Sequence, residues 1–194
     1  IISVANQKGG VGKTTTAINL GTALAAVKNK VLIVDLDAQG NASTGLGVSK
    51  EDIKVSTYDL IIGKSSLGEV VQKTKIPSLF IAPSTTDLSF VDVDLVDDSR
   101  RVMKIRDLFQ NNVKIEYDFI IIDCPPSLNL LTVNALVASN SILVPLQAEF
   151  FALEGLSQLL LTVRDIRAKI NKNIKIHGIV LTMYDKRNKL SEQI

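Results

Sequence analysis

A glycine-rich turn lies between a short apolar run and an amphipathic run near the start of the chain. The turn, Lys8 to Thr15, reads KGGVGKTT, the apolar run covers residues 1–5 and the amphipathic run covers residues 15–27. Glycines let the backbone N–H groups of a tight turn face an anion, and the first turn of a helix adds unpaired N–H groups and a partial positive charge. A strand, a glycine turn and a helix in this order predict a phosphate-binding loop. A turn that merely connects strand to helix is the weaker interpretation, because both flanking elements that a phosphate loop requires are present.

Two side chains and the backbone of this turn suit a nucleotide and its metal ion. Lys13 can reach the β- and γ-phosphates, and the hydroxyl of Thr14 can ligate Mg²⁺. We expect the nucleotide to be bound by Gly9, Gly10, Val11, Gly12, Lys13, Thr14 and Thr15. The strict pattern G-x-x-x-x-G-K-[ST] fails, because Gln7 stands where it has glycine, and a second lysine, Lys8, begins the loop.

The loop K-G-G-x-G-K-T-T resembles the deviant Walker A motif of the ParA/MinD group of P-loop ATPases. The resemblance implies ATP as the nucleotide and gives Lys8 a role in trans, in which it crosses a dimer interface and touches the partner subunit's nucleotide. There it would neutralise charge in the transition state, as an arginine finger does, and dimerisation would become a condition for full activity. A solvated loop lysine is the alternative for Lys8.

Apolar runs and amphipathic runs alternate along the whole chain. The runs expected to be strands are residues 1–5, 31–36, 79–82, 119–122, 141–145 and 174–183, and those expected to be helices are 15–27, 56–62, 67–71, 86–96, 100–109, 130–138 and 151–170. Continuous apolar strands are typical of a parallel sheet covered on both faces. The chain is therefore predicted to be an α/β P-loop layer sandwich, a mostly parallel, twisted sheet with helices on both faces. Residues 37–47, rich in glycine and polar side chains, are predicted to be a loop.

Aspartates stand at the ends of two predicted strands. Asp123 closes the run 119–122, where the Walker B aspartate of P-loop proteins holds Mg²⁺ directly or through water. Asp35 and Asp37 are two residues apart, so their side chains share a face. The segment around them, DLDAQGN, resembles the family block D-x-D-P-Q-G-N, in which the second aspartate, here Asp37, orients the attacking water and is a candidate Mg²⁺ ligand through water. Asp35 is expected to have a structural or Mg²⁺-shell role, whereas Asp37 and Asp123 could each instead only cap a turn.

The length and composition limit the other possibilities. A chain of 194 residues suits one domain, so residues 1–194 are expected to form a single P-loop ATPase domain. Proteins of the resembled family usually continue for several more elements, and we expect the C-terminal part of the family domain to lie outside this sequence. A single cysteine, Cys124, excludes an intramolecular disulfide, and no apolar run approaches the roughly 18 residues that span a bilayer.

Basic residues gather toward the end of the sequence. Residues 164–194 hold eight Lys and Arg against three Asp and Glu, although the whole chain has a net charge of only +2. Such a segment could contact DNA phosphates without sequence preference, or it could be an ordinary solvated face. The segment Thr182 to Arg187 resembles a family segment near the DNA-binding surface, which makes Arg187 the candidate DNA contact. Residues 145–156 resemble the family's segment that responds to the γ-phosphate, although Phe150 and Phe151 could equally be core residues.

The resemblance over nearly the whole chain favours a ParA/Soj-type partitioning ATPase. It implies a cytoplasmic, nucleoid-associated bacterial protein that binds ATP and Mg²⁺, forms an ATP-dependent sandwich homodimer, and binds DNA non-specifically. A ParB/Spo0J-type partner would stimulate hydrolysis and release the dimer from DNA. A MinD-type membrane-associated division-site ATPase is the first alternative. An ATP-dependent ligase of the dethiobiotin synthetase or cobyrinic-acid amidase type, which shares the deviant loop, is the second.

Overall fold

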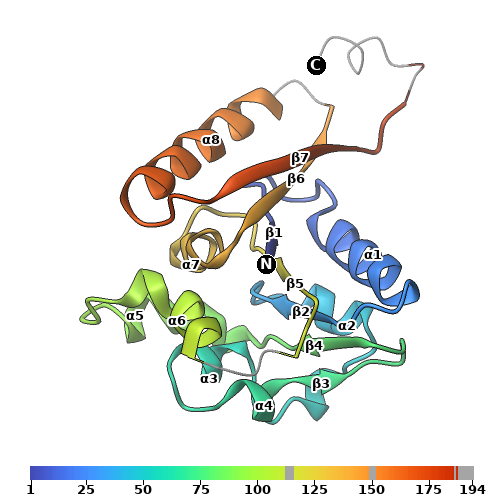
Figure 1. Cartoon of the computed structure of the whole chain (residues 1–194), viewed down its shortest axis with the longest axis vertical. Helices are drawn as coiled ribbons and strands as arrows, with labels where there is room; N and C mark the ends of the chain where they lie inside the picture. Colours follow the sequence, from blue (N-terminus) through green and yellow to red (C-terminus); the bar gives the residue numbers. More distant parts are fainter. Residues whose placement is uncertain (112–115, 149–151, 186, 188–194) are drawn as a thin grey trace.

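The computed structural model describes residues 1–111, 116–148, 152–185 and 187, and within them a seven-stranded sheet forms the centre of the molecule (Figure 1). The strands are β1 (Ile2–Val4), β2 (Val31–Asp35), β3 (Gln72–Lys73), β4 (Leu79–Ala82), β5 (Phe119–Asp123), β6 (Ser141–Gln147) and β7 (Lys175–Thr182). Their order across the sheet is β3-β4-β2-β5-β1-β6-β7. All paired strands are parallel except β3, which runs antiparallel to β4. The predicted mostly parallel sheet is confirmed.

Helices cover both faces of the sheet. Because side chains alternate along a strand, Val31 and Ile33 of β2 join one apolar cluster, and Leu32 and Val34 join the other. The first cluster is covered by α1 (Lys13–Ala26) and α2 (Asn41–Gly45). The second is covered by α3 (Thr57–Ile61), α4 (Leu67–Val70), α5 (Val91–Asp94), α6 (Lys104–Asn111), α7 (Leu130–Ala138) and α8 (Ala152–Lys169). None of the helices in the described part of the chain is long and apolar enough to cross a membrane.

The prediction of a loop over residues 37–47 is wrong in part, because residues 41–45 form α2. Gly40 precedes this helix with a left-handed φ of 68°, a conformation that glycine adopts at low cost. The helix has no apolar repeat to reveal it, and tertiary burial of Ala42 and Ser43 stabilises it instead. Strand β3 was not predicted either, since two polar residues carry no strand signal.

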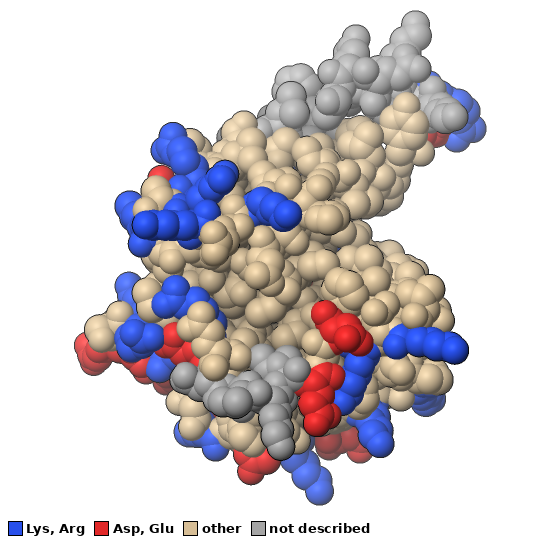
Figure 2. Space-filling model, viewed as in Figure 1, with Lys and Arg blue, Asp and Glu red and all other residues tan. Residues whose placement is uncertain are grey.

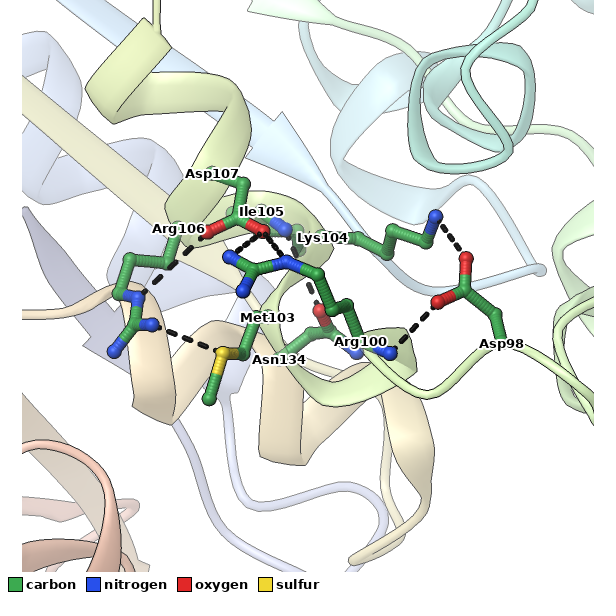
Figure 3. Close-up of polar contacts among 8 residues, drawn as sticks. All are labelled: Asp98, Arg100, Met103, Lys104, Ile105, Arg106, Asp107 and Asn134. Carbon is green, nitrogen blue, oxygen red and sulfur yellow. Dashed lines mark hydrogen bonds and ion pairs between the residues drawn. The ribbon is translucent and has the colours of Figure 1, made fainter.

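Two predicted helices are each divided into a 3₁₀ turn and an α-helix. Residues 86–96 form η2 (Thr86–Phe90) and then α5, and residues 100–109 fall in η3 (Arg101–Met103) and α6. In residues 100–109, the side chain of Asn134 on α7 accepts from the Ile105 amide at 3.4 Å (Figure 3). The same side chain donates to the Arg101 carbonyl at 2.7 Å. These contacts fix the junction between η3 and α6 from outside the segment. The amphipathic pattern of the segment itself carries no sign of this break.

Helix α1 lies unusually close to the sheet at Gly21. A Cβ atom built on Gly21 would lie 2.9 Å from Cδ1 of Ile33 and 3.3 Å from Cδ1 of Leu79. Real Cβ atoms essentially never approach another heavy atom within 3.0 Å, so a larger residue here requires the side chains of Ile33 and Leu79 to shift. Gly21 therefore allows α1 to pack closely against β2 and β4 at this point.

Candidate functional site

The loops that follow β1, β2 and β5 meet at the carboxyl edge of the sheet, where open α/β sheets bind ligands. They enclose a cavity of about 620 Å³. It is lined by Gly9, Gly10, Gly12, Lys13, Thr14, Thr15, Ile18, Asn19, Asp37, Gln39, Asn41 and Pro126. The structure thus brings six of the seven predicted loop residues together with Asp37. Val11 does not line the cavity, because its side chain is buried in the protein.

The glycine-rich turn holds a conformation that requires glycine at two positions. Gly10 has φ 75° and Gly12 has φ 84°, both in the left-handed region. Gly12 also faces strand β7, since a Cβ atom there would lie 3.4 Å from Cγ2 of Thr182. The hydroxyl of Thr182 donates to the carbonyl of Val11 at 2.9 Å. Strand β7 therefore supports the turn from behind.

Lys13 is folded back into the turn. Its side chain is buried, with 7% of the residue exposed, and its Nζ donates to the carbonyl of Lys8 at 2.7 Å. Burial lowers the pKa of Lys13, while the negative charges of Asp123 and Asp37 oppose that change. The ammonium group thus stands at the cavity in a partly desolvated position, where its attraction to an anion is stronger than in water.

Asn6, which the sequence analysis did not single out, fixes the start of the turn. Its buried side chain donates to the carbonyl of Pro145 at 2.7 Å and accepts from the backbone N–H of Lys8 at 3.0 Å. Asn6 thereby ties the turn to the end of β6. The position of Asn6, a polar residue directly after an apolar strand, is the sequence feature that could have indicated this role.

Asp123 is a buried carboxylate without the hydrogen bonds that such a group requires. It is fully buried, and within the described residues neither oxygen has a hydrogen bond of normal geometry. Burial raises the pKa of Asp123 to about 7; the adjacent Thr14 hydroxyl and Lys13 oppose the rise, and the charges of Asp35 and Asp37 add to it. Buried charges in proteins are paired or coordinate metals, so a cation beside Thr14 would satisfy this group.

The donor set suits Mg²⁺ held jointly with a phosphate ligand. Among the residues that the structure describes, no group of three or more His, Cys, Asp and Glu is placed to hold a metal ion. Mg²⁺ usually takes one or two protein ligands and completes its octahedron with phosphate oxygens and water. Thr14, which lines the cavity, and the buried Asp123 beside it match that requirement.

Replacing Asp123 by asparagine is expected to stabilise the protein without nucleotide or metal above pH 7. A carboxyl whose pKa is raised by folding favours the folded state at low pH and loses that contribution as pH rises through about 7. The difference between the two proteins could reach on the order of 4 kcal/mol at pH 8.5. Thermal denaturation of both proteins from pH 5 to 8.5 measures it. A difference in melting temperature between the two proteins that is the same at every pH in this range would contradict the raised pKa.

Asp35 and Asp37 have different environments. Asp35 is fully buried and accepts hydrogen bonds from the N–H and hydroxyl of Ser43, at 2.9 and 2.7 Å, and from the N–H of Asp37, at 3.1 Å. Asp37 is half-buried, lines the cavity, and accepts from the N–H of Gln39 at 3.0 Å. Of the two carboxylates, Asp37 therefore lies where a cavity ligand could be reached, and Asp35 organises the loop between β2 and α2.

Among the described residues, the basic side chains near the end of the chain fall into two separate groups. Exposed Arg and Lys side chains gather over the last turns of α8 and the loop into β7, at the amino edge of the sheet (Figure 2). Arg187 lies beyond the other end of β7, at the carboxyl edge, and pairs with Asp185 at 2.8 Å. Since β7 has eight residues, roughly 26 Å of strand separates the two groups. Arg187 is on the side of the cavity, whereas the larger basic group is on the opposite side.

Several cavity residues were not predicted. Ile18 and Asn19 on α1, Gln39 and Asn41 around the start of α2, and Pro126 after β5 line the cavity. The helical repeat could have indicated Ile18, because it lies four residues after Thr14 and so on the same side of α1. Phe150 and Phe151 lie outside the described residues. Cys124 is buried, and burial raises the pKa of its thiol.

Comparisons with known proteins identify the family to which the chain belongs. A family model described as an AAA domain matches residues 1–176. The chromosome partitioning protein ParA of Caulobacter vibrioides (strain NA1000 / CB15N) is 50% identical over 195 residues, covering 100% of this chain and 73% of that protein. The sporulation initiation inhibitor protein Soj of Bacillus subtilis (strain 168) is 46% identical over 194 residues, covering 100% and 76%.

Among solved structures, a cobyrinic acid a,c-diamide synthase from Mycobacterium smegmatis with bound ADP and magnesium superposes with a TM-score of 0.93. It has 35% sequence identity and covers 99% of this chain and 78% of that one. A plasmid partition protein of Borrelia burgdorferi bound to AMPPNP superposes with a TM-score of 0.86 at 26% identity, covering 99% and 77%. The fold is therefore that of the P-loop nucleotide-binding proteins, and with the identities to ParA and Soj over its full length, the chain belongs to the ParA/Soj family of chromosome partitioning ATPases.

Proposed function

We propose that this chain is a DNA-segregation ATPase whose ATP-bound form pairs into a sandwich dimer, binds nucleoid DNA without sequence preference, and is released when a ParB/Spo0J-type partner stimulates hydrolysis. It would act in the bacterial cytoplasm, on the nucleoid. One observation carries the proposal: Lys13 and the half-buried Asp37 line one cavity of the glycine-rich turn, and the buried carboxylate of Asp123 lies close enough to Lys13 and Thr14 to interact with both. The identity to ParA over the whole chain supports the cellular role.

The residues of the cavity divide the chemistry between them. In this proposal the backbone of residues 9–15, with Val11 contributing only its main chain, holds the phosphates, and Lys13 exchanges its bond to the Lys8 carbonyl for a phosphate oxygen. Asp123 and Thr14 hold Mg²⁺, which neutralises phosphate charge when it is bound. Asp37 orients the attacking water, accepts its hydrogen bond, and contacts Mg²⁺ through water. ATP is cleaved to ADP and phosphate, slowly until the partner protein binds.

Replacing Lys8 by alanine is expected to preserve ATP binding and abolish ATP-dependent dimerisation. The backbone of Lys8 already serves its own subunit, since its carbonyl accepts from Lys13 and its N–H donates to Asn6. These backbone contacts survive truncation of the side chain. The substitution would therefore remove only the contact between Lys8 and the nucleotide of the partner subunit. Light scattering with and without ATP measures the dimer, and Lys54→Ala, at an exposed lysine remote from the turn, is the control. A normal dimer in Lys8→Ala would argue against the role in trans.

Replacing Arg187 by glutamate is expected to weaken binding to random-sequence duplex DNA. Each lost phosphate contact lowers the slope of log K against log salt by about 1 and costs affinity most at low salt. Arg187 is exposed and held only by Asp185 in the structure described, so reversal of its charge should not affect folding. Fluorescence anisotropy at several salt concentrations gives the slope, with Lys54→Glu as the control. An unchanged slope would remove Arg187 from the DNA surface.

A second candidate, ATP-dependent amide formation, has one observation in its favour. The synthase from Mycobacterium smegmatis superposes over 99% of this chain at 35% identity. The 50% identity to ParA favours partitioning. ATP turnover measured with duplex DNA, with anionic vesicles, and with a carboxylic acid plus an amine donor separates these functions and the membrane alternative.

A further inference from the structure

A chain of buried hydrogen bonds runs from Asp35 to the backbone of Asp37 through two serines. The hydroxyl of Ser43 donates to Oδ2 of Asp35 at 2.7 Å, and the N–H of Ser84 donates to the hydroxyl oxygen of Ser43 at 3.1 Å. The hydroxyl of Ser84 then donates to the carbonyl of Asp37 at 2.6 Å. Ser84 follows β4, whereas Asp35 ends β2, so the chain joins two neighbouring strands of the sheet.

Both backbone groups of Asp37 are thereby held by side chains. Its N–H donates to Oδ1 of Asp35 at 3.1 Å, and its carbonyl accepts from the Ser84 hydroxyl at 2.6 Å and from the N–H of Gly40 at 2.9 Å. The bond from Gly40 closes the turn itself, whereas the bonds of Asp35 and Ser84 anchor the turn to the ends of β2 and β4. The direction in which the carboxylate of Asp37 leaves the backbone is therefore set by Asp35 and Ser84 together with the turn.

The chain is shielded from water. Asp35, Ser43 and Ser84 are all buried, with at most 2% of each residue exposed. Low local dielectric strengthens such bonds and makes an unpaired member costly, which rigidifies a fully satisfied chain.

We propose that Ser84 is a positioning residue for ATP hydrolysis, which holds the main chain of Asp37 so that its carboxylate meets the attacking water. The inference rests on the proposed role of Asp37. Ser84 does not line the large cavity; it lines a smaller one of about 160 Å³ that shares only Gln39 with it. Its influence is on the geometry of a single carboxylate, and a misplacement of about 1 Å can slow an enzymatic step about 100-fold.

The test compares two serines of equal burial. Ser84 and Ser139 are both 2% exposed, and each hydroxyl donates to a backbone carbonyl, that of Asp37 at 2.6 Å and that of Ala135 at 2.8 Å. Ser139 precedes β6 and so lies at the amino edge of the sheet, whereas Ser84 follows β4 at the carboxyl edge. Ser84→Ala should lower kcat for ATP at least about 10-fold with KM changed less than about 3-fold, whereas Ser139→Ala should leave both unchanged. Equal effects of the two variants on kcat would overturn the inference.

A double substitution separates this inference from the function on which it rests. In an Asp37→Ala background, Ser84→Ala should have no further effect on kcat, because the carboxylate it positions is gone. If Asp37→Ala alone left kcat unchanged, the proposed role of Asp37 would fail. If Asp37→Ala lowered kcat and Ser84→Ala lowered it again by the same factor as in the native chain, only the positioning role would fail. If the alanine variant folds poorly, Ser84→Cys replaces it in the test. Cysteine has a similar volume but is a weak hydrogen-bond donor, so the same loss of kcat is expected.

Discussion

Lys13→Ala is expected to lose at least about 100-fold in affinity for ATP. A charge-assisted hydrogen bond contributes about 1.5–3 kcal/mol, and the partly desolvated position of Lys13 places its contribution near the upper end. The substitution also removes the cation nearest Asp123, whose raised pKa Lys13 opposes. Without it, the repulsion between the carboxylates and the phosphates increases. Isothermal titration with a non-hydrolysable ATP analogue and Mg²⁺ measures the loss.

The control for this prediction is Lys54→Ala, which removes the same charge from an exposed position away from the cavity. Its affinity for the analogue should match that of the unmodified chain. A melting temperature for Lys13→Ala close to that of the unmodified chain would show that the loop still folds. Unchanged affinity in a folded Lys13→Ala protein would refute the phosphate role of this lysine.

Asp37→Ala is expected to bind ATP nearly normally and to hydrolyse it about 100- to 1,000-fold more slowly. General-base and water-orienting groups contribute about 10²- to 10⁴-fold to a rate, and the effect falls on the chemical step. Binding should change little, because the loop backbone and Lys13 carry the phosphate contacts in the proposed arrangement. Removing one negative charge from the cavity could even strengthen binding slightly. Single-turnover hydrolysis with excess enzyme measures the step directly.

Asp92→Ala is the matched control for Asp37, since it removes an exposed aspartate from α5, outside the cavity lining. It should leave both binding and turnover unchanged. Two results would contradict the role given to Asp37. One is a normal single-turnover rate, and the other is a loss of ATP binding as large as the loss of hydrolysis, which would indicate a phosphate or metal contact instead.

Features that depend on local pattern were predicted correctly. The apolar run at 119–122 became β5, which extends by one residue to Asp123, and residues 130–138 form α7 with the predicted bounds. A strand buried on both faces and a helix with an apolar face leave their signal in the sequence itself. The phosphate turn belongs to this class, because its glycines answer a local requirement for left-handed backbone.

Features that depend on partners from elsewhere in the chain were missed. Helix α2 is stabilised by the bonds from Ser43 to Asp35 and by its burial against α1, neither of which a helical repeat reports. The division of residues 100–109 follows from Asn134, which lies on another helix. Likewise, the basic residues that are close in sequence lie at opposite ends of β7, because an extended strand carries them apart.

The contact at Gly21 implies an uneven tolerance of change along α1. In a library of random variants selected for ATP turnover, bulky residues at position 21 should be poorly tolerated, although Gly21 does not line the cavity. Ala23 and Ala26, on the outer side of the same helix, should accept bulky residues. A bulky residue at position 21 would thus impair function through the packing of α1 on the sheet, without removing any contact in the cavity.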